Sequence, residues 1–145
     1  MGMREEVEEG ISALEAGLPV IVTDHHLAYE IADEVSYRHG YTIQALYAWE
    51  LVSPRTSRQP TREGTMRYTY TRLQPYRSVL IISDVDSVPQ DKQPVLIQLV
   101  EKGKMTMMGI YVPEGTKIIL HARDLKKVHP VLLNKLIYIG KRAVS

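Results

Sequence analysis

Apolar residues at helical spacing predict four helices in this chain. In the first, Val7, Ile11 and Leu14 lie three or four positions apart, as on one face of a helix. Gly17 and Gly40 follow the first two helices as stop residues. The four helices are expected over residues 4–16, 24–39, about 91–102 and 130–135.

Short apolar runs between these helices predict buried strands. Residues 105–112 alternate about Gly109 and predict a β-hairpin. Strands that alternate with helices indicate an α/β fold, in which a mostly parallel sheet lies between two helical layers. The runs cover residues 19–22, 41–45, 79–82, 117–120 and 136–139.

The composition is typical of one globular domain. The chain has 145 residues, of which 44% are hydrophobic and 24% charged. No apolar run approaches the length of a membrane helix, and the acidic start does not resemble a signal peptide, so we expect a soluble cytoplasmic protein without a membrane partner. The absence of cysteine excludes thiol catalysis and thiolate metal sites. That absence and the single asparagine, Asn134, are also typical of thermophile proteins.

Charge is distributed unevenly along the chain. Residues 1–50 carry two basic and ten acidic groups, whereas residues 53–77 carry six arginines and one glutamate. This Arg/Tyr-rich segment is also rich in Pro, Ser and Thr, and we expect a long loop, an extended arm or an edge hairpin. Arginine interleaved with tyrosine suits phosphate contacts and base stacking, or docking on an acidic protein. The candidate binding residues are Arg55, Arg58, Arg62, Arg67, Tyr68, Tyr70, Arg72, Tyr76 and Arg77. A purely structural role for the segment remains open.

Over residues 17–141 the order of strands and helices resembles the core of AAA+ ATPases, most closely the MoxR-type branch. GLPVIV and the helix after it resemble the first strand and helix of that core, and VLIISDVDSVPQ resembles its Walker B strand. TKIILHARDLKK resembles its sensor 1 strand. The resemblance implies a P-loop NTPase-like sheet of five strands in the order 5-1-4-3-2. In a departure from the family, we expect no helical lid domain in this chain.

The residues at the ATPase positions depart from that family. A phosphate-binding loop needs glycines, a lysine and a hydroxyl, but the chain has only Thr23, Asp24, His25 and His26 there. Other departures stand at the Walker B, sensor 1 and arginine-finger positions: Ser83, Asp84, Asp86, Ala122 and Lys135. We therefore expect neither ATP binding nor hydrolysis, and no bound cofactor.

The implied strand order brings histidines and carboxylates to one edge of the sheet. His25, His26, His121 and Asp84 could bind a divalent metal there. Alternatively, these side chains cap a helix and hydrogen-bond the strand ends.

The sequence thus predicts a non-catalytic AAA+-like module, a pseudo-ATPase that contacts nucleic acid or a protein partner through the Arg/Tyr-rich segment. The alternative is an unorthodox nucleotide sensor or a metal-dependent hydrolase that uses the histidine edge. The acidic first helix could also meet the basic arm of a neighbouring copy, which would give a homo-oligomer. A third alternative is that the resemblance is accidental and the chain is an unrelated α/β domain.

Overall fold

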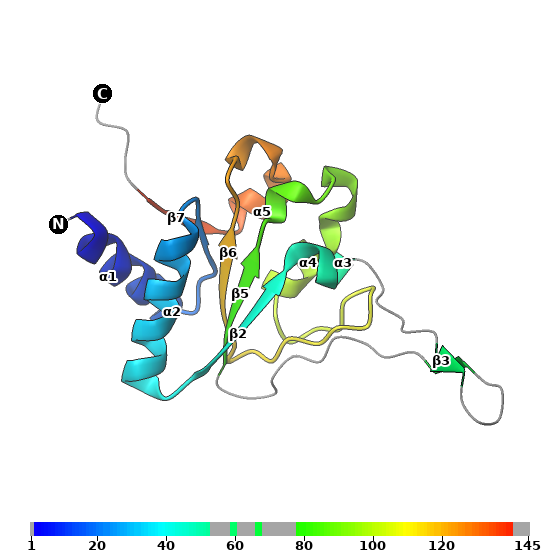
Figure 1. Cartoon of the computed structure of the whole chain (residues 1–145), viewed down its shortest axis with the longest axis horizontal. Helices are drawn as coiled ribbons and strands as arrows, with labels where there is room; N and C mark the ends of the chain where they lie inside the picture. The colour runs from blue at the N-terminus through cyan, green and yellow to red at the C-terminus, as the bar shows by residue number, and fades with distance from the viewer. Residues whose placement is uncertain (1, 53–58, 61–65, 68–77, 141–145) are drawn as a thin grey trace.

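The computed structural model describes residues 2–52, 59–60, 66–67 and 78–140 (Figure 1). Strands and helices alternate along most of this chain. The helices are α1 (Gly2–Glu15), α2 (His25–His39), α3 (Ala48–Val52), α4 (Pro94–Val100) and α5 (Pro130–Asn134), with short 3₁₀ turns η1 (Val85–Ser87), η2 (Gln90–Lys92) and η3 (Leu125–Lys127). The strands are β1 (Val20–Val22), β2 (Thr42–Tyr47), β3 (Gln59–Pro60), β4 (Met66–Arg67), β5 (Ser78–Ser83), β6 (Lys117–His121) and β7 (Ile137–Ile139).

Five strands form one parallel sheet in the order β2-β5-β6-β1-β7. Counted along the chain, these are strands 2, 3, 4, 1 and 5, so the expected order 5-1-4-3-2 is confirmed. All residues of β1 and β5 are buried, as the continuous apolar runs predict for central parallel strands.

Helices cover the two faces of the sheet in separate groups (Figure 1). The chain moves from β1 to one edge of the sheet through α2, then returns across it from β2 towards β7. Connections between parallel strands are right-handed, so helices that precede and follow a reversal of direction across the sheet lie on opposite faces. Accordingly, α1 and α2 pack on one face of the sheet, and α3, α4 and α5 pack on the other. The expected three-layer α/β architecture is therefore observed.

The ends of the helices follow from their local sequence. Asp24 caps the start of α2, and Gly40 ends it in the left-handed conformation, at φ 71°. Pro94 stands in the first turn of α4, where a missing backbone N–H costs nothing. This helix is shorter than expected, because residues 90–92 form a 3₁₀ turn before it. No helix in the described parts of the chain has the length and apolar character needed to cross a membrane.

The hairpin expected over residues 105–112 is reduced to a turn, and that prediction was wrong in extent. A single antiparallel bridge joins Met105 and Tyr111, and Gly109 turns the chain at φ 78°. The hydroxyl of Thr106 accepts a hydrogen bond from the backbone N–H of Ile110 at 3.1 Å, and the backbone N–H of Thr106 donates to the carbonyl of Ile110 at 2.8 Å, so bonds between these two residues close the turn.

Strands β3 and β4 form a separate antiparallel pair, in which Gln59 lies opposite Arg67 and Pro60 opposite Met66. The pair belongs to the Arg/Tyr-rich segment and does not join the five-stranded sheet. Most candidate binding residues of this segment lie outside the described residues: Arg55, Arg58, Arg62, Tyr68, Tyr70, Arg72, Tyr76 and Arg77.

Candidate functional site

The candidate site lies where β1, β5 and β6 end and α2 begins. In the sheet register Val22 of β1 pairs with His121 of β6, and Ile82 of β5 pairs with Leu120. Parallel strands present their carboxyl ends at one edge, which is where open α/β sheets bind ligands. The register therefore brings Ser83 and His121 to the same level, next to the first turn of α2.

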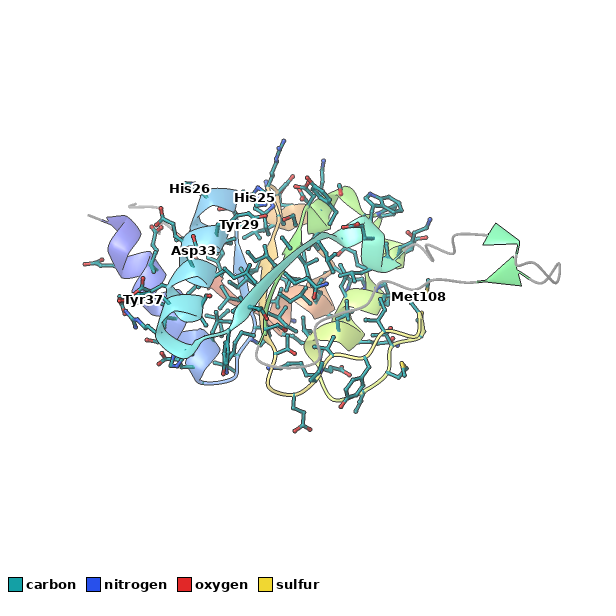
Figure 2. All side chains as sticks on the ribbon, turned by 60° about the horizontal axis from the view of Figure 1, so that its bottom comes forward. His25, His26, Tyr29, Asp33, Tyr37 and Met108 are labelled. Carbon is teal, nitrogen blue, oxygen red and sulfur yellow. The ribbon has the colours of Figure 1, made fainter. Side chains whose placement is uncertain are left out.

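A hydrogen bond links His25 to Ser83 across this edge. The Nε2 atom of His25 lies 2.9 Å from the Oγ atom of Ser83. Ser83 is only 3% exposed, whereas His25, in the first turn of α2, is exposed (Figure 2). The histidine thus gives a buried hydroxyl its partner and ties the start of α2 to the end of β5.

The imidazole of His121 lies against that of His25. The ring centroids are 4.6 Å apart, and His121 is 3% exposed. Its Nδ1 atom accepts a hydrogen bond from the backbone N–H of Asp84 at 3.3 Å. Burial, and next the nearby His25, lower the pKa of His121 below 6.5 and outweigh the opposite effects of Asp84 and Asp86. His121 is therefore a neutral acceptor at neutral pH.

Asp84 holds an unusual backbone conformation at the end of β5. Its φ of 57° and ψ of 46° are left-handed values that few residues other than glycine adopt. The backbone carbonyl of Asp84 accepts a hydrogen bond from the hydroxyl of Ser87 at 2.6 Å, and the Oδ1 atom lies 3.5 Å from Nδ1 of His121. These contacts hold the turn that follows the strand.

The amino end of α2 is occupied by a carboxylate of the protein itself. The Oδ1 atom of Asp24 accepts a hydrogen bond from the backbone N–H of His26 at 2.9 Å. Free N–H groups at a helix N-terminus are what a phosphate-binding loop offers to its ligand. Here only Thr23 and Asp24 separate β1 from α2, and the Asp24 side chain takes the place of an anion.

The structure brings together three of the four residues of the hypothetical metal site. His25, His121 and Asp84 lie at one edge, but the Nε2 atom of His26 lies 3.2 Å from Oε1 of Glu30, and the His26 side chain is 74% exposed. Within the described ranges no group of three or more His, Cys, Asp or Glu side chains has an arrangement that could hold a metal ion. The arrangement of the described side chains therefore does not support the hypothesis of a divalent-metal site at this edge.

The residues at the other expected ATPase positions pack in the core or bond to neighbouring parts of the chain. Ala122 is fully buried, and its backbone N–H donates to the carbonyl of Val22 at 3.1 Å. Lys135 lies at the end of α5, with its Nζ atom 3.4 Å from Oε1 of Glu101. Asp86 accepts a hydrogen bond from the backbone N–H of Asp124 at 3.1 Å, which links η1 to η3.

Sequence reasoning assigned no role to Gln93, which is fully buried beside this edge. Its Nε2 atom donates to the carbonyls of Val88, at 2.8 Å, and Lys127, at 3.0 Å. Its Oε1 atom accepts from the backbone N–H of His129 at 2.7 Å. The available signal was an amide directly before an apolar helix, but two of these three partners, Lys127 and His129, lie more than 30 residues away in the sequence.

Comparison with known proteins supports the fold more than the function. No protein-family model matches the sequence. Over 100 residues the chain is 25% identical to Partitioning defective protein 6 of Caenorhabditis elegans. The aligned region covers 69% of this chain and 31% of that protein. The structure is similar to that of NtrX from Brucella abortus with a TM-score of 0.61 and 15% identity, over 97% of this chain and 36% of that one. The chain thus spans about a third of each relative, and the likeness to NtrX shows a shared α/β fold.

Proposed function

We propose that this chain is a non-catalytic binding module built on a P-loop NTPase-like scaffold, a degenerate AAA+ core. The strand order agrees with that scaffold, and the amino end of α2 stands where the scaffold would hold phosphate. The observation that carries the proposal is the Asp24 carboxylate, which accepts a hydrogen bond from the backbone N–H of His26.

The chemistry of this edge opposes nucleotide binding. A triphosphate placed at the start of α2 would meet the negative charge of Asp24, and no lysine stands in the turn to offset it. Beside it, the hydrogen bond between His25 and Ser83 closes the space next to the end of β5, where a Walker B acid would hold Mg²⁺. Titration of the protein with Mg–ATP is therefore expected to show no binding.

The binding function is assigned to the Arg/Tyr-rich segment, residues 53–77. Its six arginines can neutralise phosphates or carboxylates, and its tyrosines can stack on bases. The described part, β3 with β4, is a short ribbon outside the main sheet, so contacts made by this segment do not require the sheet to open.

Charge reversal in this segment tests the binding role. The variant with Arg58→Glu, Arg62→Glu and Arg67→Glu is expected to lose the binding of single-stranded nucleic acid or of protein partners captured by the wild type. A matched variant with Lys104→Glu, Lys126→Glu and Lys127→Glu changes the same number of charges at exposed lysines elsewhere. Fluorescence anisotropy with labelled oligonucleotides and quantitative capture at one salt concentration give the comparison. Equal binding by wild type and the arginine variant would refute the role of the segment.

One observation favours an enzyme instead. The 2.9 Å distance between His25 Nε2 and Ser83 Oγ is that of a general base and its nucleophile. Hydrolysis of an ester or phosphoester that is lost in both Ser83→Ala and His25→Ala would support this second function. The slight exposure of Ser83, 3%, argues against it, because a substrate would have to reach the hydroxyl.

A further inference from the structure

A groove lies at the opposite edge of the sheet from β2, between α1 and β7. We call it the α1–β7 groove. It has a volume of about 650 Å³ and is lined by Glu5, Glu8 and Glu9 of α1 and by Ile137, Tyr138 and Ile139 of β7. None of these residues belongs to the candidate site described above.

Strand β7 is an open edge of the sheet. Among the described strands it pairs only with β1, so its other side offers backbone N–H and C=O groups without a strand partner. Ile137 and Tyr138 are 39% and 44% exposed at this edge, which is high for apolar side chains in a strand. An extended segment could therefore add to β7 as a further strand.

The carboxylates of α1 determine the charge of the side chains that an added strand needs. Ile139 packs in the core between the sheet and α1, so α1 covers the face of the sheet beside this edge. Glu5, Glu8 and Glu9 are exposed, and of these three only Glu8 forms an ion pair within the described parts of the chain, with Arg38 at 2.7 Å. Alternate side chains of an added strand would point towards these carboxylates, which favours arginine or lysine at those positions.

We propose that the α1–β7 groove binds the Arg/Tyr-rich segment of a second copy of this chain. The argument is charge complementarity, because that segment has six arginines and one glutamate while the groove has three glutamates. From Met66 to Arg72, Thr and Tyr side chains alternate, and Met66–Arg67 is already a strand. Arg67 and Arg72 would lie on opposite faces of an extended strand, so either orientation of an added strand turns one arginine towards the carboxylates.

We place the contact between two copies because the described part of the segment lies far from α1 within one molecule. Figure 1 places β3 and α1 at opposite ends of the structure. A contact between different surfaces of two copies is heterologous, so it builds a ring if it closes and a filament if it does not. The inference deepens the proposed function by naming the partner of the segment, and it does not depend on whether nucleotide binds.

Sedimentation velocity over a range of protein concentrations tests this contact. The wild type is expected to associate at low salt and to dissociate as salt is raised. Glu5→Lys with Glu9→Lys, and separately Arg67→Glu with Arg72→Glu, should each weaken association by about tenfold or more. The matched control, Asp33→Lys with Asp91→Lys, reverses two exposed acids outside the groove and should associate like the wild type.

Mixing the two charge-reversed variants provides the decisive comparison. If the groove and the segment meet, the mixture regains association that neither variant has alone. A wild type that stays monomeric at low salt would overturn the inference, as would unchanged association in the groove variant. Nucleic-acid binding without self-association would leave the proposed function standing and refute the contact, whereas ATP binding would refute the proposed function and leave this contact intact.

Discussion

His25 and Ser83 share a hydrogen bond of 2.9 Å between residues 58 positions apart in the chain. The bond joins the first turn of α2 to the last residue of β5. It therefore fastens a helix to the sheet at the edge where related folds leave room for a ligand. We therefore expect the stability of this edge to depend on the hydrogen bond between His25 and Ser83.

Replacing His25 should destabilise the protein more than replacing its neighbour. His25→Ala leaves the buried hydroxyl of Ser83 without this partner, and we expect a loss of about 1 kcal/mol in the free energy of unfolding. His26→Ala, a change of the same size at an exposed position, should stay within about 0.5 kcal/mol of the wild type. Urea denaturation measures both. Equal losses would show that the hydrogen bond does not stabilise the edge.

Removal of the cap on α2 should also be measurable. Asp24→Ala takes away the acceptor for the backbone N–H of His26, and the expected cost is about 1 kcal/mol. Asp33→Ala, in the exposed middle of the same helix, is the control and should change the stability little. A loss in the control as large as that in Asp24→Ala would contradict the capping role.

Gln93 is expected to be the most sensitive polar residue near the site. Gln93→Leu keeps a similar volume but leaves the carbonyls of Val88 and Lys127 and the N–H of His129 without this partner. The expected loss is roughly 3 kcal/mol. Gln90→Leu, at an exposed glutamine close by, should cost less than about 0.5 kcal/mol. Thermal and urea unfolding that rank the two variants the other way would refute this role.

His121 should make the fold less stable in weak acid. Its pKa in the folded state lies below 6.5, so on acidification the unfolded chain takes up the proton first. Its contribution to stability is complete above about pH 6.5 and is lost as the pH falls towards the folded-state pKa. The groups that act on it are His25, Asp84, Asp86 and Arg123.

The variant His121→Asn isolates this contribution. Asparagine keeps an acceptor for the N–H of Asp84 but does not titrate. Unfolding in urea at about pH 7.5 and about pH 5.5 should show a smaller loss of stability in the variant than in the wild type. The same loss in both proteins would show that His121 does not contribute to the pH dependence.

Local pattern was sufficient to predict most of the helices and strands, whereas their order in the sheet came from the family resemblance. The buried runs of β1 and β5 and the Asp24 and Gly40 ends of α2 depend on neighbouring residues alone. The hairpin prediction for residues 105–112 was wrong in extent because alternating Met and Thr residues are also typical of a strand. In the structure the Thr106 side chain helps to close a tight turn.

The site could be predicted only in part, because its contacts cross the chain. Strand order indicated that the ends of β1, β5 and β6 meet, but not that His25 would bond to Ser83. One residue along a helix turns a side chain by about 100°, which is why His26 lies against Glu30 and not beside His25. The bonds of Gln93 depend on loops that no local pattern specifies.

Calorimetric titration of the purified protein with ATP and Mg²⁺ tests the central claim most directly. With Asp24 at the start of α2 and His25 bonded to Ser83, we predict no heat of binding at high protein concentration. The Asp24→Ala variant is predicted to behave the same way, because the turn still lacks the glycines and lysine of a phosphate-binding loop. Saturable binding of ATP by the wild type at micromolar concentration would contradict the account.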